Sequence, residues 1–293
     1  MIHVFCRILV AAAFAVSSTA VASEGFQDSF EAAPSPIQSW AKRVFLVGSG
    51  QETPIGTAFL IHNDSNGLHF VTAKHVAEQC GKAASCFLYP QASYRRSTLE
   101  SRIEASYRLK INQTRVYTPV HASGAPNNLR NSDLGYFKTD KNSLAPQIQL
   151  EELRAKLQDL PLNKTADVDH YVVGYPDLTS RESYAWTSYD RTLKLRWSFG
   201  AKLRKRGPTD GAANAHNHRT QIDSDADSLP GSSGSPVVNA EGELIGILQG
   251  GPNSTEYLEL PWFYSFIVPS DTLRHFIGAI LLETKAAPQL SQP

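Results

Sequence analysis

Three side chains that together could activate a hydroxyl group lie far apart along the chain: His75, Asp133 and Ser233. A serine hydroxyl is a poor nucleophile until a base accepts its proton, and the base must itself be held by a third group. The order His, Asp, Ser differs from the order in α/β-hydrolases and subtilisins. The α/β-hydrolase turn also needs glycine two residues after the nucleophile, where this chain has Ser235. Taken singly, such a histidine is commonly just packed or solvated, and such an aspartate can belong to a turn.

Ser233 stands in Gly231-Ser-Ser-Gly-Ser-Pro236, a segment of small residues that predicts a tight turn. Glycine adopts backbone conformations that other residues avoid, so N–H groups in such a turn can point outward. Two N–H groups that converge beside a hydroxyl would form an oxyanion hole next to a nucleophile. A serine- and glycine-rich surface hairpin is the alternative interpretation of this segment alone.

Short apolar segments separated by turn residues must position these groups. Strands are expected at residues 44–47, 55–61 and 68–72, and the last one leads to His75, where a helical turn begins. Asp133 opens a further apolar strand. After the Ser233 turn, two buried strands are expected around an Asn-Ala-Glu-Gly hairpin.

Two helices are expected besides the strands. Leucines at helical spacing predict a bridging helix over residues 150–160, and an apolar stripe predicts a C-terminal helix over residues 270–283. The resulting order of β-rich, helix, β-rich, helix predicts an all-β fold of two barrels rather than a parallel sheet. The N-terminal barrel would cover about residues 44–147 and the C-terminal barrel about 165–269.

The N-terminus has the pattern of an export signal. A basic residue, an apolar stretch and small residues ending in Ala20-Val-Ala22 predict a signal peptide over residues 1–22. Residues 23–43 are interpreted as a flexible lead or a short propeptide, and residues 286–293 as a disordered tail. Arg43-Val44 superficially resembles a protease-activation junction, but the apolar run that follows favours a first strand. We therefore expect a secreted or periplasmic protein with no membrane segment in its mature form.

Cysteine usage and charge limit the remaining possibilities. Cys6 lies inside the signal, so Cys80 and Cys86 remain, and an even pair in an exported chain suggests one disulfide bond. Two reduced, buried thiols are the alternative. The ligands are too few for a zinc site, and the alternating aspartates at 223, 225 and 227 lack the glycine and glutamate of a calcium loop. No metal and no cofactor are expected. With 28 basic and 28 acidic residues, the chain is not expected to bind nucleic acid.

Several motifs in sequence order resemble those of the chymotrypsin-fold (trypsin-like) serine proteases. They are Gly56-Thr-Ala-Phe-Leu-Ile61, Val71-Thr-Ala-Lys-His-Val76, Asp133-Leu-Gly-Tyr-Phe137 and Gly231-Ser-Ser-Gly-Ser-Pro236. The resemblance covers roughly residues 44 to 280 and is closest to the bacterial trypsin-like and glutamyl-endopeptidase (V8-like) branch. It implies two six-stranded antiparallel barrels, with the peptidase domain at residues 44–285.

The resemblance also implies roles for individual residues. Ser233 would attack the scissile carbonyl, His75 would accept and return its proton, and Asp133 would orient the imidazole. The N–H groups of Gly231 and Ser233 would bind the oxyanion, each contributing roughly 3 kcal/mol. Ser232 stands where the animal digestive members have an aspartate that receives a freed N-terminal ammonium. Activation by that mechanism is therefore not expected here.

Specificity is inferred from the residues around the turn. Asp227, six residues before Ser233, and the adjacent Ser228 match the bottom of the first specificity pocket of trypsin-like members, which favours lysine or arginine. Because aspartates alternate at 223, 225 and 227, a surface position for any of them is the alternative. Leu248 occupies the position at which glutamyl members carry a pocket histidine, so glutamate specificity is disfavoured. Gly250 completes the expected pocket.

The sequence thus predicts an exported, monomeric serine endopeptidase that acts on proteins or peptides. The alternative from another functional class is a catalytically silent member of the same fold that serves as a binding or adhesion module. A catalytically silent member usually lacks a catalytic residue or has a damaged oxyanion turn, and the sequence shows neither change.

Overall fold

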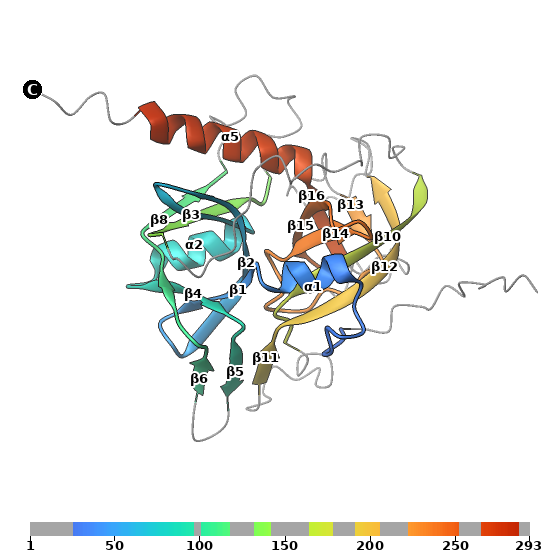
Figure 1. Ribbon diagram of the computed structural model, residues 1–293, viewed down its shortest axis with the longest axis horizontal. Helices are drawn as coiled ribbons and strands as arrows, with labels where there is room; N and C mark the ends of the chain where they lie inside the picture. The colour runs from blue at the N-terminus through green and yellow to red at the C-terminus, as the bar shows by residue number, and fades with distance from the viewer. Residues whose placement is uncertain are drawn as a thin grey trace, which may run out of the picture.

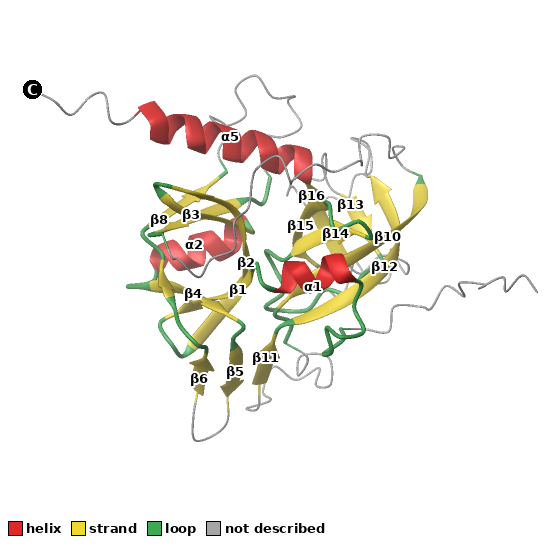
Figure 2. Cartoon of the chain, viewed as in Figure 1, coloured by secondary structure: helices red, strands yellow, loops and turns green. Residues whose placement is uncertain are grey.

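Two β-sheet units lie side by side in the computed structural model, and a long helix passes over both (Figure 1). The structure describes residues 26–96, 101–117, 132–141, 164–177, 191–205, 222–251 and 265–286. Strands dominate these residues and the helices are few (Figure 2), which confirms the predicted all-β, two-barrel fold. The expected signal, bridging helix and tail lie outside the described residues.

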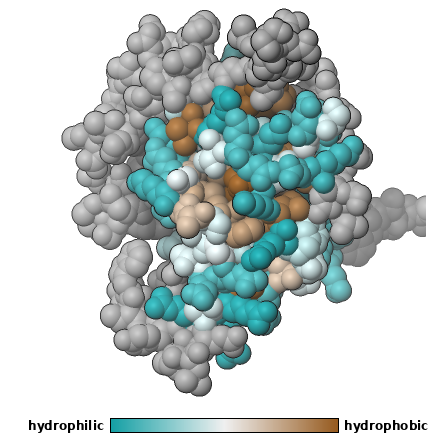
Figure 3. Space-filling view, turned by 90° about the vertical axis from the view of Figure 1, so that its left-hand side faces the viewer, coloured by the Kyte–Doolittle hydropathy of each residue, from teal (hydrophilic) through white to brown (hydrophobic). Residues whose placement is uncertain are grey.

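The first unit is a sheet of seven antiparallel strands around a buried apolar cluster that includes Phe45, Leu60 and Phe70. The side of the molecule that it forms presents hydrophobic patches among hydrophilic residues (Figure 3). In order of pairing, the strands are β7 (Leu109–Lys110), β4 (Cys86–Pro90), β1 (Val44–Ser49), β2 (Thr53–Asp64), β3 (Gly67–Thr72), β9 (Gly135–Thr139) and β8 (Gln113–Val116).

The seven strands differ from the six that the resemblance implied, because the last strand of the ring is interrupted. β7 and β8 are consecutive along the chain, and only Ile111 and Asn112 separate them. The N–H of Ile111 donates to Cys86 in β4, at 3.0 Å, and the N–H of Asn112 donates to Lys138 in β9, at 2.9 Å. Successive N–H groups of an extended chain point to opposite sides, so these two residues tie both edges of the sheet together. β7 and β8 therefore act as one bent strand that closes the first barrel.

The second unit is a closed barrel of six strands, as expected. Its apolar core includes Val172, Leu203, Val237 and Ile267. Around the ring, the strands are β10 (Thr165–Gly174), β12 (Arg196–Lys205), β13 (Ile222–Ser224), β16 (Ser265–Pro269), β15 (Leu244–Gly250) and β14 (Pro236–Asn239).

A small third sheet connects the two barrels. β11 (Arg191–Lys194) pairs with β5 (Ser93–Arg96), which in turn pairs with β6 (Ser101–Glu104). Beside it, the N–H of Ala92 donates to the buried hydroxyl of Tyr175 at 3.1 Å. These contacts fix the relative position of the barrels and hence of any site between them.

The long helix over both barrels is α5 (Ser270–Ala286), three residues longer than the predicted helix. Its apolar stripe is buried through Leu273, Phe276, Ile277 and Ile280. The Phe276 ring lies 5.6 Å from that of Tyr117, which comes just after β8 of the first barrel. Among the described residues, no helix is both long and apolar enough to span a bilayer.

Parts of the segment predicted as a flexible lead are packed against the second barrel. Gln27 exchanges two backbone hydrogen bonds with Trp197, and Asp28 pairs with Arg196. A short helix that the sequence did not predict, α1 (Ser35–Ala41), buries Ile37 and Trp40. Apolar residues at i and i+3 and a proline in the first turn were the signs of this helix in a segment otherwise rich in polar residues.

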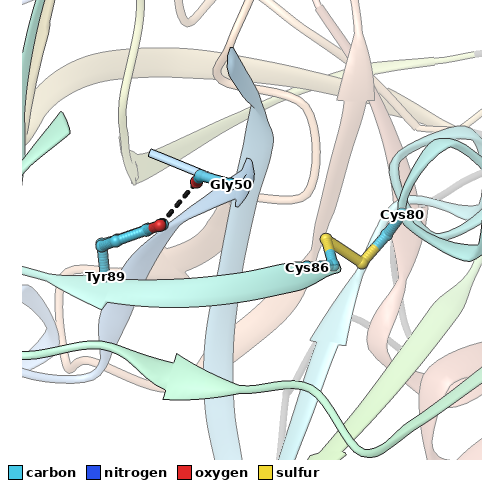
Figure 4. The surroundings of a disulfide bond; sticks show 4 residues. All are labelled: Gly50, Cys80, Cys86 and Tyr89. Carbon is cyan, nitrogen blue, oxygen red and sulfur yellow. Dashed lines mark hydrogen bonds between the residues drawn. A yellow bond between two sulfur atoms is a disulfide. The ribbon is translucent and has the colours of Figure 1, made fainter. Parts of the chain in front are cut away.

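The helix α2 (Lys74–Lys82) follows β3 directly and is linked to β4 by a disulfide bond. Cys80 and Cys86 form this bond, as the sequence predicted (Figure 4). On the same strand, the hydroxyl of Tyr89 donates to the backbone oxygen of Gly50 (Figure 4). The helix that carries His75 is thus covalently attached to the barrel.

Candidate active site

His75 lies in the first turn of α2, immediately after the strand β3 ends. Its Nδ1 atom is 2.9 Å from one carboxylate oxygen of Asp133, and its backbone N–H donates to the other oxygen at 3.1 Å. An ionised carboxylate can only accept hydrogen bonds, so Nδ1 carries the proton of the neutral ring. The Nε2 atom of His75 is then the unprotonated atom, which is the form a general base requires.

Close packing of β9 against α2 brings Asp133 to His75. Gly135 makes this approach possible, because a Cβ atom there would lie 2.5 Å from the Cβ of Ala77. Leu134, fully buried, holds the chain between them, and its C=O accepts from the N–H of Tyr117 at 2.8 Å. The aspartate therefore owes its position to the glycine two residues later and the contacts of its neighbour.

The charge of Asp133 determines the proton affinity of the imidazole. Burial would by itself lower the pKa of His75, but the hydrogen bond and charge of Asp133, with a smaller effect of Glu78, outweigh it. The net result is a pKa above the ordinary value of 6.5. The His75 side chain is 44% exposed and that of Asp133 only 15%, so the imidazole can meet a substrate while its partner is shielded.

Ser233 lies in the turn between β13 and β14, and its side chain is partly exposed. Gly231 and Gly234 have φ angles of 88° and 90°, in the left-handed region that favours glycine. A Cβ atom at Gly234 would also lie 2.1 Å from the backbone oxygen of Thr57. The turn can therefore form only with glycine at these positions, as the motif indicated.

The backbone of this turn leaves two N–H groups available. Ser232 donates to Leu229 at 3.0 Å and Gly234 to Leu248 at 2.7 Å. Within the described part of the chain, the N–H groups of Gly231 and Ser233 donate no hydrogen bond. Two N–H groups without a hydrogen bond in the turn that carries a serine hydroxyl are the kind of donors that an oxyanion hole uses.

The turn lies against the segment that carries His75. A Cβ atom at Gly56 would be 2.6 Å from the side chain of Val76 and 3.1 Å from the backbone oxygen of Ser233. The residue next to His75 and the nucleophile candidate thus approach the same glycine. Within the described residues, the Ser233 hydroxyl makes no hydrogen bond to His75. Catalytic hydrogen bonds are often long without substrate and tighten in the complex.

Ser232 stands where animal digestive members have an aspartate, and its side chain makes contacts inside its own turn. Its hydroxyl donates to the backbone oxygen of Leu229 at 2.5 Å and accepts from the N–H of the same residue at 3.1 Å. Arg43 and Val44 run without interruption into β1, and Val44 is only 1% exposed. The strand interpretation of this junction is the one the structure shows, and the turn is held without a freed N-terminus.

The three alternating aspartates have different surroundings. Asp223 is fully buried and accepts two hydrogen bonds from Arg204, at 2.6 and 3.0 Å. Asp225 accepts from the N–H groups of Ala201 and Lys202, both at 2.9 Å. These two have structural contacts within the barrel. Asp227 is buried as well, at 7% exposure, and stands nearest to the turn in sequence.

The other residues expected in the specificity pocket differ in how they lie relative to Ser233. A Cβ atom at Gly250 would lie 3.8 Å from the Ser233 hydroxyl, so this residue borders the nucleophile. Ser228 is partly exposed. Leu248, in contrast, has its side chain fully buried in the core of the second barrel. Its place at the end of the apolar run of residues 244–248 was the sign that it belongs to the core.

A second histidine–aspartate pair lies in the same barrel and was not singled out from the sequence. His69, in β3, is 1% exposed, and its Nε2 atom is 3.2 Å from Asp64. Its Nδ1 atom is 2.7 Å from the hydroxyl of Tyr136. Burial lowers the pKa of His69, and the opposing effect of Asp64 does not compensate. This pair has the residue types of the His75 pair but no access to a substrate.

Comparison with known proteins gives matches to a family model and to solved structures. A family model described as the trypsin-like peptidase domain matches residues 56–247. Comparison with curated proteins gave no match. Among solved structures, the inactive form of Rv3671c protease matches with a TM-score of 0.51 and 14% identity, over 86% of this chain and 96% of that one. A serine-to-alanine mutant of Rv3671c from M. tuberculosis H37Rv, also inactive, gives 0.50 and 15%, over 91% and 96%.

A third solved structure is less similar. The MamO protease domain from Magnetospirillum magneticum has a TM-score of 0.47 and 16% identity, over 81% of this chain and 96% of that one. At these identities the two Rv3671c structures indicate a shared fold and nothing about the reaction.

Proposed function

The chain belongs to the trypsin-like peptidase family, and on this premise we propose that it is an exported serine endopeptidase with the triad Ser233, His75 and Asp133. The observation that carries the proposal is the hydrogen bond between His75 and Asp133, which leaves Nε2 of the imidazole as a base. A serine on a turn with two unpaired N–H groups lies against the same segment.

The proposed reaction proceeds through an acyl-enzyme. Ser233 attacks the peptide carbonyl carbon while Nε2 of His75 accepts the hydroxyl proton, and the N–H groups of Gly231 and Ser233 bind the oxyanion. The imidazolium then gives the proton to the leaving amine, and the peptide C–N bond breaks. Water then attacks the ester carbon while Nε2 of His75 accepts a proton from the water. The imidazolium returns this proton to the Ser233 oxygen, and the carboxylic acid product leaves. Asp133 stabilises the imidazolium in each half of the cycle and stays ionised.

For specificity we propose a preference for lysine or arginine before the cleaved bond. The support is the position of Asp227, a buried residue that stands six positions before Ser233 in the segment leading into the turn. Asp227→Ser should move cleavage away from basic residues in a peptide library. An unchanged cleavage profile would contradict the pocket assignment.

Export and processing are part of the proposal. We assign residues 1–22 as a signal peptide and residues 44–285 as the peptidase domain of a monomer. N-terminal sequencing of the exported protein should give a chain that begins just after Ala22 and retains residues 26–43, parts of which pack against the second barrel. A start at Val44 would contradict this, because it would remove α1 and the Asp28 contacts.

The experiment that tests the function uses a fluorophosphonate probe and a peptide substrate. Ser233→Ala should abolish labelling and lower kcat by about 10⁶-fold, as loss of the nucleophile does in other serine proteases. Ser39→Ala changes an exposed serine in α1, outside the site, and should keep both properties. If the parent chain neither reacts nor cleaves while a control protease does both, the alternative of a silent binding module is favoured.

A further inference from the structure

Thr57 is a fully buried residue of β2 that contacts the nucleophile turn with both its backbone and its side chain. Its N–H donates to the backbone oxygen of Ser233 at 2.9 Å, and its hydroxyl donates to that of Gly231 at 2.8 Å. The same hydroxyl accepts from the N–H of Tyr175 at 3.1 Å. β2 belongs to the first barrel, whereas the turn lies between strands of the second. One residue of the first barrel thus holds the turn of the other.

The direction of the two oxyanion N–H groups is set by the carbonyl groups of Pro230 and Ser232, which share their peptide planes. The carbonyl groups of Gly231 and Ser233 fix the peptide planes that follow each of these N–H groups. In a trans peptide the C=O and the following N–H point in opposite directions, and the chain has no cis peptide among its described residues. The oxygen of Pro230 accepts from the N–H of Asp177 at 2.8 Å. The oxygen of Ser232 accepts from the N–H and the hydroxyl of Ser235, at 3.0 and 2.6 Å. These bonds point the N–H groups of the next residues toward the opposite side.

The two remaining carbonyl groups of the turn, those of Gly231 and Ser233, are both held by Thr57. A threonine hydroxyl has one donor and can accept from others, and here its donor and one acceptor position are used. Because Thr57 is fully buried, water does not take its place at these groups. Without the hydroxyl, the Gly231 oxygen and the Tyr175 N–H would both lose their hydrogen bond. A buried polar group without a partner destabilises the arrangement that contains it.

We propose that Thr57 is a positioning residue that holds the oxyanion turn in its active conformation across the junction of the two barrels. The proposal rests on the proposed function, since an oxyanion hole matters only to a chain that performs acyl transfer. Its hydroxyl makes the oxyanion hole of the second barrel dependent on docking of the first. Thr57 touches neither the substrate nor the reacting atoms and acts through the backbone of residues 231–233.

The test compares Thr57→Val, which replaces the hydroxyl by a methyl group of similar shape, with Thr57→Ser, which keeps the hydroxyl. We expect Thr57→Val to lower kcat roughly 10- to 100-fold with KM nearly unchanged, less than the loss of one oxyanion donor outright. Affinity for a peptide aldehyde, whose hemiacetal oxygen occupies the oxyanion hole, should fall in parallel. Thr57→Ser should restore both within a few-fold.

Thr139→Val is the matched control, because Thr139 is a buried threonine of the same sheet whose hydroxyl donates only to the backbone oxygen of Asp140. It should lower the melting temperature without changing kcat or aldehyde affinity. Wild-type kcat and aldehyde affinity in Thr57→Val would overturn the inference. Equal losses in Thr57→Val and Thr139→Val would reduce the role of Thr57 to general stability and overturn it as well.

A measurement without catalysis separates this inference from the proposed function. Hydrogen exchange of residues 229–236 should become faster in Thr57→Val than in the parent chain and stay unchanged in Thr139→Val. Unchanged exchange in both variants would overturn the inference even in an active enzyme. Absence of cleavage and labelling by the parent chain would overturn the proposed function, and with it the catalytic role of Thr57. Faster exchange alone would then show only that Thr57 holds the turn.

Discussion

Two histidine–aspartate pairs in the first barrel have the same chemical groups, but the pKa values of their histidines are shifted in opposite directions. His75 and Asp133 lie 2.9 Å apart at the barrel junction, and His69 and Asp64 lie 3.2 Å apart within the sheet. The pKa of His75 is raised and that of His69 is lowered. His75 is 44% exposed, whereas His69 is 1% exposed and receives a further contact from a tyrosine. A carboxylate neighbour therefore makes a base only where burial does not cancel its charge.

The largest expected effect separates the two aspartates by activity. Asp133→Asn should lower kcat about 10⁴-fold, because an amide can donate to Nδ1 and so favours the wrong imidazole tautomer. Asp64→Asn should leave kcat within a few-fold of the parent, since its histidine is buried away from the substrate. Steady-state kinetics on one peptide substrate measures both. Comparable losses in the two variants would remove the distinction between the pairs.

The disulfide bond should distinguish the pairs by local stability. Cys80→Ala combined with Cys86→Ala should lower the free energy of unfolding by about 2–3 kcal/mol, measured by urea denaturation. α2, which carries His75, loses its covalent link to β4, whereas β3, which carries His69, remains paired on both sides. Amide exchange should therefore accelerate in α2 and not in β3. Uniform acceleration in both elements would contradict this local effect.

The pH dependence of activity should report on His75 alone. His75 accepts a proton only when neutral, so kcat/KM should fall as the pH decreases through its raised pKa, with a midpoint above 6.5. Asp133→Asn should move this midpoint to lower pH, and Asp64→Asn should leave it in place. If Asp64→Asn shifted the midpoint and Asp133→Asn did not, the assignment of His75 as the base would be contradicted.

The pH dependence of stability should have opposite signs for the two histidines, and this is the smallest of the expected effects. A lowered pKa makes the folded state resist protonation, so His69 should cost stability as the pH falls below 6.5. A raised pKa means that His75 adds stability below 6.5, which is lost as the pH rises through its folded value. As the pH falls from about 7.5 to about 5.5, the unfolding free energy of His69→Gln should decrease less than that of the parent chain. Over the same range, the unfolding free energy of His75→Gln should decrease more than that of the parent chain. The unfolding free energies come from urea denaturation at each pH. If both substitutions changed the pH dependence in the same direction, the comparison would be contradicted.

Local signals in the sequence predicted the elements that carry the site. Apolar runs separated by strong turn residues indicated β1 to β3, and the apolar stripe of residues 273–281 indicated α5. The glycines of the Ser233 turn were informative because they permit backbone conformations that few other residues adopt. Contacts between distant segments were not accessible in this way.

Three features of the site depend on such distant contacts. The bonds of Thr57 to the nucleophile turn join residues of different barrels, and nothing in the apolar run around Thr57 points to the turn. The different surroundings of Asp223, Asp225 and Asp227 follow from which strand lies beside each one. The contacts of Gln27 and Asp28 with the second barrel depend on the surface that this barrel presents, which a short polar segment does not specify.

The position of α5 has a consequence for the order of events during synthesis. Phe276 packs on Tyr117, and the N–H of Tyr117 holds the residue next to Asp133. Residues 270–286 leave the ribosome after both barrels have been translated, so the carboxylate beside the imidazole gains its last support only then. A nascent chain with both barrels but without this helix would present its hydroxyl and its imidazole before the acid is held in place. The three catalytic groups would thus be held together only after this helix has been translated and has packed on the first barrel.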